Sequence, residues 1–142
     1  MKIFIGSDHA GYDLKEKILK KYDSSFDFHN CGCYSNESVD YPDFAKEVVS
    51  CLQKNKDSFG ILICGSGIGI SIAANRFKGI RAALCTSVMH AKMSRLHNNA
   101  NILALGSRLT EETDIFKILE TFFKSPFEGD RHEHRINKID KI

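Results

Sequence analysis

The sequence predicts an α/β fold, a three-layer α/β/α sandwich built on a five-stranded parallel sheet. Two observations support this prediction. Short apolar runs of β-type residues alternate with amphipathic stretches of helical periodicity along all 142 residues. Strands separated by helices pair in parallel through right-handed crossovers, which leave helices on both faces of the sheet. We expect a single domain, residues 1–142, because no linker-like tract or internal repeat divides the chain.

The strands are expected where apolar residues run between turn residues. They cover residues 2–6, 26–30, 60–64, 81–85 and 101–105. The run GILIC at 60–64 is the most apolar, as expected for a central strand that is covered on both faces. The pattern is Rossmann-like, and in such sheets ligands bind beyond the carboxyl ends of the strands. The residues that follow each strand are therefore the candidates for a functional site.

The helices are expected between the strands, where apolar residues recur at helical spacing. They are 12–22 (Leu14, Ile18, Tyr22), a helix opened by Pro42 (Phe44, Val48, Leu52), one after residue 69 carrying Ile72 and Ala73, 88–98, and 110–124 (Ile115, Ile118, Leu119, Phe122, Phe123). After Pro126 we expect a loop and then a short polar helix from about Asp130.

Composition narrows the class of protein. The chain carries 20 basic and 18 acidic residues, a formal charge of +2, which gives no reason to expect nucleic acid or a membrane surface as a partner. The first apolar run is too short for a signal peptide or a membrane span. The five cysteines are an odd number and several lie in apolar segments, so we expect no disulfide framework and a cytoplasmic location.

A glycine loop follows the third expected strand. In CGSGIG, Gly65, Gly67 and Gly69 alternate with Ser66 and Ile68. Alternate glycines allow the backbone to approach a ligand closely, and the N–H groups of such a loop favour negative charge. The Gly-Lys-Ser/Thr ending of a phosphate loop is absent, and the dinucleotide fingerprint would have to follow the first strand. The loop therefore predicts an anion cradle of another kind.

Cys64 ends the third expected strand, directly before this loop. A thiol beside a helix N-terminus has its thiolate stabilised and can serve as a base or nucleophile. The alternative is that Cys64 is a small core residue, as free cysteines commonly are. Position alone leaves both interpretations open.

His97 and Asp8 have two interpretations each, and His9 shares the first interpretation of Asp8. His97 lies near the end of the helix 88–98, where a cation is favoured, so it suits a proton donor or simply caps its helix at the surface. Asp8 and His9 follow the first strand and could hold sugar hydroxyl groups. Asp8 could equally be a helix N-cap.

Arginines suggest a phosphate clamp. Arg131 and Arg135 are four residues apart and share a helical face, and Arg108 follows the fifth strand. The alternative is a solvated basic tail. Tyr41 precedes Pro42 as either a pocket wall or a packing residue.

No metal site is expected. The pair Cys31 and Cys33 has no second pair at a matching spacing, and the histidines of His132-Glu-His134 do not share a helical face.

Taken together, these segments resemble the type B ribose-5-phosphate isomerases, a family that also holds the galactose-6-phosphate isomerase subunits. The matching segments are GSDHAGYDLK at 6–15, DYPDFA at 40–45, GILICGSGIGISIAANRFKGIRAA at 60–83, RLHNNANILALGSR at 95–108 and RHEHR at 131–135. The resemblance implies an enzyme of the pentose phosphate pathway without a cofactor, working as a homodimer or a dimer of dimers with sites at the subunit interface. It implies Cys64 as the base and His97 as the residue that helps open the sugar ring. The residues that it implies bind substrate are Asp8, His9, Tyr41, Gly65, Ser66, Gly67, Ile68, Gly69, Asn98, Arg108, Arg131 and Arg135.

The chain departs from the family pattern at a few positions. Some members use a glutamate just after the glycine loop as base, but Ile70 stands there, so the chain resembles the cysteine type. Ser66 replaces a common threonine, and Asp130 a frequent glycine. We expect interconversion of ribose 5-phosphate and ribulose 5-phosphate through an enediolate. The alternatives are an isomerase of a six-carbon sugar phosphate such as allose or galactose 6-phosphate, a flavodoxin-like ligand-binding module, or a non-catalytic sugar-phosphate sensor.

Overall fold

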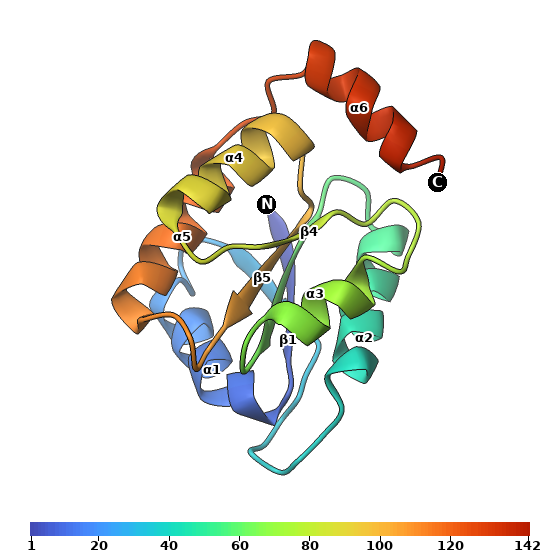
Figure 1. Cartoon of the computed structure of the whole chain (residues 1–142). Coiled ribbons are helices and arrows are strands. Elements are labelled where there is room, and N and C mark those ends of the chain that lie inside the picture. Colours follow the sequence, from blue (N-terminus) through green and yellow to red (C-terminus); the bar gives the residue numbers. More distant parts are fainter.

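The computed structural model describes residues 1–142 and contains one five-stranded parallel sheet between two layers of helices (Figure 1). The strands are β1 (Lys2–Ser7), β2 (Asp27–Asn30), β3 (Phe59–Cys64), β4 (Ala82–Leu84) and β5 (Ile102–Gly106). Their spatial order is β2-β1-β3-β5-β4, and every neighbouring pair is parallel. The predicted three-layer α/β/α fold is confirmed.

The helices divide between the two faces of the sheet. They are the 3-10 turn η1 (His9–Gly11) and the α-helices α1 (Tyr12–Lys21), α2 (Tyr41–Lys54), α3 (Ile68–Ala74), α4 (Val88–Asn98), α5 (Glu112–Lys124) and α6 (Arg131–Ile139). Side chains of α1, α4 and α5 pack on one face, and those of α2 and α3 pack on the other. None of these helices combines the length and the apolar character needed to cross a bilayer.

Strand β3 contributes alternate side chains to the two cores. Ile61 and Ile63 join the core under α1, α4 and α5, whereas Leu62 and Cys64 join the core under α2 and α3. This alternation follows from the period of two along a strand. Because both faces are covered, the whole strand is apolar, as the sequence indicated. Cys64 therefore lies on the face covered by α2 and α3, and α3 begins within the glycine loop, at Ile68.

The expected elements agree with the observed ones to within about two residues at each end, the usual uncertainty of helix and strand limits. Two details differ. Ile72, expected to be carried by the third helix, is 60% exposed, and the buried residues of α3 are Ile70, Ser71 and Ala74. In α2, Ala45 and Val49 are fully buried beside the expected Val48 and Leu52, so the helix faces the sheet along a wider stripe than expected.

Strand β2 lies on one side of β1, and the later strands all lie on the other side, so the strand order reverses between β1 and β3. In open α/β sheets, ligands bind at such a reversal point. The turn η1 is held against this point. The Asp8 N–H donates to the Ile63 carbonyl (3.1 Å), and a Cβ at Gly11 would lie 2.6 Å from the same oxygen. The glycine therefore allows η1 to rest directly on the end of β3, which brings Asp8 beside Cys64.

Candidate active site

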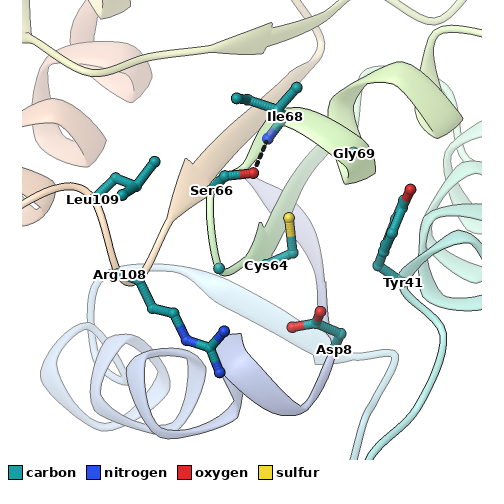
Figure 2. Close-up of a pocket in the computed structure, with 9 residues that line it drawn as sticks. Asp8, Tyr41, Cys64, Ser66, Ile68, Gly69, Arg108 and Leu109 are labelled. Atoms are coloured by element: carbon teal, nitrogen blue, oxygen red, sulfur yellow. Dashed lines mark hydrogen bonds between the residues drawn. The ribbon is translucent and has the colours of Figure 1, made fainter.

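An open cavity of about 550 Å³ lies at this reversal point, at the carboxyl end of the sheet (Figure 2). Residues that follow β1, β3 and β5 line it, together with the first residue of α2. They are Asp8, Tyr41, Cys64, Gly65, Ser66, Ile68, Gly69, Arg108 and Leu109. Arg108 is the only cation in this set and Asp8 the only anion. The structure thus brings together most of the residues that the sequence indicated at the strand ends.

Cys64 is both a core residue and a wall of the cavity. It is only 4% exposed, and its Sγ accepts a hydrogen bond from the Gly67 N–H at 3.2 Å. Figure 2 shows the thiol between the glycine loop and the Tyr41 ring. An amide that donates to sulfur stabilises a thiolate more than a neutral thiol, because hydrogen bonds to charged acceptors are stronger. The two interpretations of Cys64 from the sequence are therefore compatible.

The loop depends on glycine at position 67. Gly67 has φ +76° and caps α3, so its backbone is in the left-handed region. A Cβ there would lie 2.6 Å from Leu84 Cδ1 and 2.8 Å from the Leu105 carbonyl carbon. The next amide, of Ile68, donates to Ser66 Oγ (3.1 Å) and closes the turn. This turn aims the Gly67 N–H at the Cys64 sulfur.

We expect Gly67→Ala to destabilise the protein by more than backbone strain alone. Gly79 is the matched control, because it also has a positive φ (+78°) but nothing within 4 Å of the added Cβ. Gly79→Ala should lower the free energy of unfolding by about 1–2 kcal/mol. Gly67→Ala should cost a further amount of about 1–3 kcal/mol for the clash with Leu84 and β5. Urea denaturation of both variants measures the difference, and equal losses would contradict the packing described for the loop.

Asp8 and His9 are fixed by the backbone around them. Asp8 Oδ1 accepts from the Gly11 N–H (3.1 Å), so the side chain caps η1 while it also lines the cavity. His9 Nδ1 accepts from the Val39 N–H (3.1 Å), which leaves the proton of a neutral ring on Nε2. His9 is not among the residues that line the cavity. Its Nε2–H remains available as a donor next to Asp8.

Arg108 and Tyr41 border the cavity on either side of Cys64. The Arg108 N–H donates to the Gly65 carbonyl (2.9 Å), which ties the chain after β5 to the glycine loop. The Tyr41 ring lies against Gly69, where a Cβ would be 2.8 Å from Tyr41 Oη. Leu109, which the sequence analysis did not single out, also lines the cavity and is 71% exposed. The sequence feature that could have identified Leu109 as a cavity residue is its position directly after Arg108.

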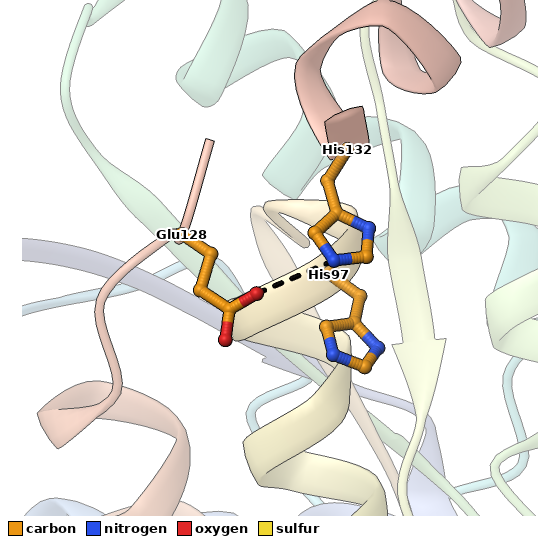
Figure 3. A group of neighbouring side chains, drawn as sticks. All are labelled: His97, Glu128 and His132. Atoms are coloured by element: carbon orange, nitrogen blue, oxygen red, sulfur yellow. Dashed lines mark ion pairs between the residues drawn. The ribbon is translucent and has the colours of Figure 1, made fainter. Parts of the chain in front are cut away.

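The remaining residues implied by the resemblance, His97, Asn98, Arg131 and Arg135, lie elsewhere. The His97 ring stacks on that of His132, with centroids 4.3 Å apart and an interplanar angle of 14° (Figure 3). Burial, together with the charge of Arg131, lowers the pKa of His132. Arg131 and Arg135 are exposed on α6 beside this pair. One face of the molecule thus carries an imidazole pair and two arginines.

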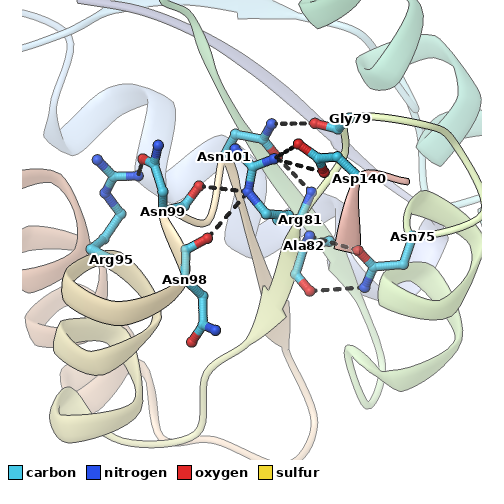
Figure 4. A network of polar contacts seen from close by, with 9 residues as sticks. All are labelled: Asn75, Gly79, Arg81, Ala82, Arg95, Asn98, Asn99, Asn101 and Asp140. Atoms are coloured by element: carbon cyan, nitrogen blue, oxygen red, sulfur yellow. Dashed lines mark hydrogen bonds and ion pairs between the residues drawn. The ribbon is translucent and has the colours of Figure 1, made fainter. Parts of the chain in front are cut away.

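The course of α4 explains this separation. The helix follows β4 and returns to the start of β5, so its last turn lies at the amino edge of the sheet. Arg81, just before β4, holds it there by donating from Nε to the carbonyls of Asn98 and Asn99 (3.1 Å each), and from Nη1 to the Asp140 carboxylate beyond α6 (Figure 4). Cys64 lies at the other end of a six-residue strand. His97 and Cys64 of one chain therefore lie at opposite edges of the sheet, separated by roughly 17–20 Å, the length of a strand.

Known proteins match this chain along nearly all of its length. A family model for the ribose/galactose isomerases matches residues 3–139. The ribose-5-phosphate isomerase B of Escherichia coli is 39% identical over 142 residues, which cover 99% of this chain and 95% of that protein. The chain belongs to the ribose/galactose isomerase family.

Solved structures of ribose/galactose isomerases share the fold closely. A ribose 5-phosphate isomerase of Thermotoga maritima is 52% identical and has a TM-score of 0.96, covering 99% of this chain and 98% of that one. The ribose-5-phosphate isomerase B of Mycoplasma genitalium, solved with bound ribulose-5-phosphate, is 44% identical, has a TM-score of 0.94 and covers 99% and 94% of the two chains. The resemblance drawn from the sequence motifs is confirmed.

Membership in the ribose/galactose isomerases makes the chain an enzyme of the intramolecular oxidoreductase class, which moves hydrogen within one sugar molecule. The flavodoxin-like alternative is not supported. The strand order is 2-1-3-5-4, whereas a flavodoxin-like sheet has the order 2-1-3-4-5. The exchange of the last two strands brings β5, with Arg108 after it, next to β3 and Cys64.

Proposed function

We propose that this enzyme interconverts ribose 5-phosphate and ribulose 5-phosphate in the cytoplasm, with Cys64 as the base. The main support is the Cys64 sulfur at the cavity wall, with the Gly67 N–H donating to it. A second support is that relatives named ribose-5-phosphate isomerase B share 39–44% of their residues with this chain, one of them with ribulose-5-phosphate bound. The cavity offers a base, one cation and several loop amides, which are the groups that an aldose–ketose isomerase of a sugar phosphate needs.

The reaction moves one proton between two adjacent carbons. After ring opening, the Cys64 thiolate removes the proton from C2 of the aldose, and the electron pair moves into a C1–C2 double bond as negative charge develops on the C1 oxygen. The same thiol then returns the proton to C1, while the proton of the C2 hydroxyl passes to the C1 oxygen, so that C2 becomes the ketone and C1 the alcohol. No electrons leave the substrate.

The oxyanion of the enediolate needs a free donor near Cys64. The Gly67 and Ile68 amides already have partners, Cys64 Sγ and Ser66 Oγ. The Gly69 amide is different, because the second residue of a helix has no intrahelical acceptor. Gly69 also lines the cavity. We therefore assign its N–H to the oxyanion, where a preorganised donor typically contributes about 2.7–4 kcal/mol to lowering the barrier.

A second copy of the chain would complete the site. A phosphate group carries about two negative charges, and Arg108 alone faces the cavity. His97, Asn98, Arg131 and Arg135 are at the far edge of the same chain, so they would reach a cavity only in a neighbouring copy. The rim of the cavity is apolar and exposed at Leu109 and Ile68, and Ile72 continues it along α3. These features support a homodimer, or a pair of dimers, with shared active sites.

In such a dimer the roles divide between the two copies. One supplies Cys64, the loop Gly65–Gly69, Asp8, His9 and Tyr41, with Arg108 directed to the phosphate. The other supplies His97, which donates a proton to the ring oxygen as the furanose opens, with Asn98 beside it. Arg131 and Arg135 of that second copy bind the phosphate through guanidinium groups, whose planar donors match phosphate oxygens.

Turnover on two substrates tests the proposed reaction. We expect ribose 5-phosphate to be isomerised with a kcat/KM higher than that of allose 6-phosphate by about ten-fold or more, the usual discrimination for one carbon unit in a fitted pocket. Ketose formation by the purified enzyme measures both, and the Cys64→Ala variant purified in parallel excludes a contaminating isomerase. Faster turnover of allose 6-phosphate would favour the six-carbon alternative, and no turnover of either would contradict the proposal.

A further inference from the structure

Three potential ligands meet at the end of α4, outside the cavity. They are His97, Glu128 in the segment before α6, and His132 in the first turn of α6, and one ligand atom of each lies within 4.8 Å of the other two. Figure 3 shows the two imidazoles face to face with the carboxylate beside them. The cluster joins two segments of the chain that are about thirty residues apart.

His132 Nε2 lacks a hydrogen bond. The side chain is buried, with 6% of the residue exposed, and this nitrogen is the buried side-chain polar atom without a hydrogen-bond partner. The Glu128 carboxylate is 3.3 Å away, close enough for an ion pair but not in hydrogen-bond geometry. A buried polar atom without a partner costs roughly 1–3 kcal/mol, so a ligand that engages it would be favoured.

We propose that His97, Glu128 and His132 form a binding site for a divalent transition-metal ion of the zinc type. Two imidazole nitrogens and one carboxylate are a donor set that zinc uses, with a water completing the tetrahedron. The two nitrogen donors disfavour magnesium and calcium, which take oxygen ligands. Arg131 and Arg135 add positive charge nearby but are exposed, so solvent screens their repulsion.

The cluster must contract to hold zinc, because tetrahedral ligand atoms roughly 2.0–2.2 Å from the ion lie about 3.3–3.6 Å apart, whereas the ligand atoms here lie up to 4.8 Å apart. The exposed Glu128 and the half-buried His97 can rotate, whereas His132 is held by burial. The rings are nearly parallel, so their lone pairs run side by side and do not converge. Metal binding therefore requires the His97 ring to turn out of the stack.

This movement has a consequence for the reaction, which rests on the proposed function. A His97 ring bound to zinc cannot donate a proton to the sugar ring oxygen. Zinc should then inhibit the isomerase, and a chelator should reverse the inhibition. The metal would act as an inhibitor that competes for the imidazole, not as a cofactor.

Cobalt(II) is the spectroscopic probe for the site itself. Titrated into the metal-free wild-type enzyme, it should give the visible absorption of a four-coordinate ion with one equivalent bound per chain. Glu128→Gln and His132→Gln should each weaken binding by at least about 10–100-fold, the loss seen when only an outer partner of a metal ligand is removed. His134→Gln, on the exposed side of α6, is the matched control and should bind as the wild type does.

Two results would overturn the metal site. One is cobalt bound as tightly by Glu128→Gln as by the wild type, a comparison that avoids any folding defect from the buried His132. The other is a thiolate-to-cobalt charge-transfer band, which would assign the ion to cysteine.

Inhibition is measured separately with zinc, and Glu128→Gln should retain its activity in zinc concentrations that inhibit the wild type. Stoichiometric cobalt binding at the cluster with no inhibition by zinc would leave the site standing and contradict the role of His97 in the proposed function.

Discussion

Replacing Cys64 with alanine should lower the turnover of ribose 5-phosphate by about 10²–10⁴-fold, the range that a positioned proton-transfer group contributes. The reason is local. Apart from Asp8 and Tyr41, no other titratable side chain on the cavity wall could accept the proton. Asp8 Oδ1 already caps η1, and a phenol is a far weaker base than a thiolate. Initial rates at saturating and at low substrate separate the loss of turnover from any change in KM.

The folded state should survive this substitution. A thiol that borders a cavity leaves little additional void when it is shortened, so we expect a loss of about 1 kcal/mol or less in unfolding free energy. Cys51→Ala, on α2 and away from the cavity, is the matched control and should retain full turnover. A folded Cys64→Ala enzyme with near-normal turnover would remove Cys64 from the mechanism.

His97→Ala should also reduce turnover, by about 10²-fold, the lower end of the contribution of general acids, because sugar rings also open slowly in water. The side chain is half-buried at the molecular surface, so its removal leaves a space that a small solute can enter. Imidazole added to the solution should therefore restore part of the turnover. A merely structural role for His97 predicts no such rescue.

Cys64→Ala is the control for this rescue, because imidazole cannot replace a base that is buried beside the glycine loop. Both variants are assayed with the same imidazole series at constant pH and ionic strength. Equal stimulation of the two would indicate a general solvent effect, and a His97→Ala enzyme that turns over as fast as the wild type would contradict the assignment.

The fold was largely predictable because its signals are local. The periodicity of each segment gave the type of element, and the apolar run GILIC correctly indicated the central strand β3. The order of the strands was not predicted, since it depends on pairings between distant segments. Strand β5 is buried from Ile102 to Gly106, whereas β4 is half-buried. This difference is consistent with β5 lying inside the sheet and β4 at its edge.

The burial of polar residues could not be predicted from the hydrophobic periodicity of single segments. Lys15 was not among the apolar residues expected to face inward from the first helix, yet it is fully buried. Its Nζ donates to Asn30 Oδ1 (2.9 Å) and to the exposed Glu16 (3.0 Å). Arg95 is similarly buried, and its Nε donates to the carbonyl of Ser125 (3.3 Å), just after α5. Such residues are satisfied by partners from other segments, which a single-segment pattern does not contain.

The candidate site was also predictable only in part. The rule that ligands bind at the carboxyl ends of strands led to Asp8, Cys64 and Arg108, and these line one cavity. The rule says nothing of helix ends. Residues at the end of a crossover helix, such as His97, lie at the amino edge of the sheet, and this consequence of the alternating pattern was not drawn from the sequence. The cluster of His97 with Glu128 and His132 was also missed, because His97 lies in a segment distant from the other two and no local spacing connects the three residues.

Mixing two inactive variants tests most directly whether two copies share each active site. Cys64→Ala and His97→Ala chains are unfolded together and refolded at equal amounts, so that half of the dimers contain one chain of each kind. Each mixed dimer then holds one intact site and one doubly altered site, and we expect about one quarter of the wild-type activity to return. Activity that stays at the level of the separate variants, in a sample shown to contain mixed dimers, would contradict a site built from Cys64 of one chain and His97 of another.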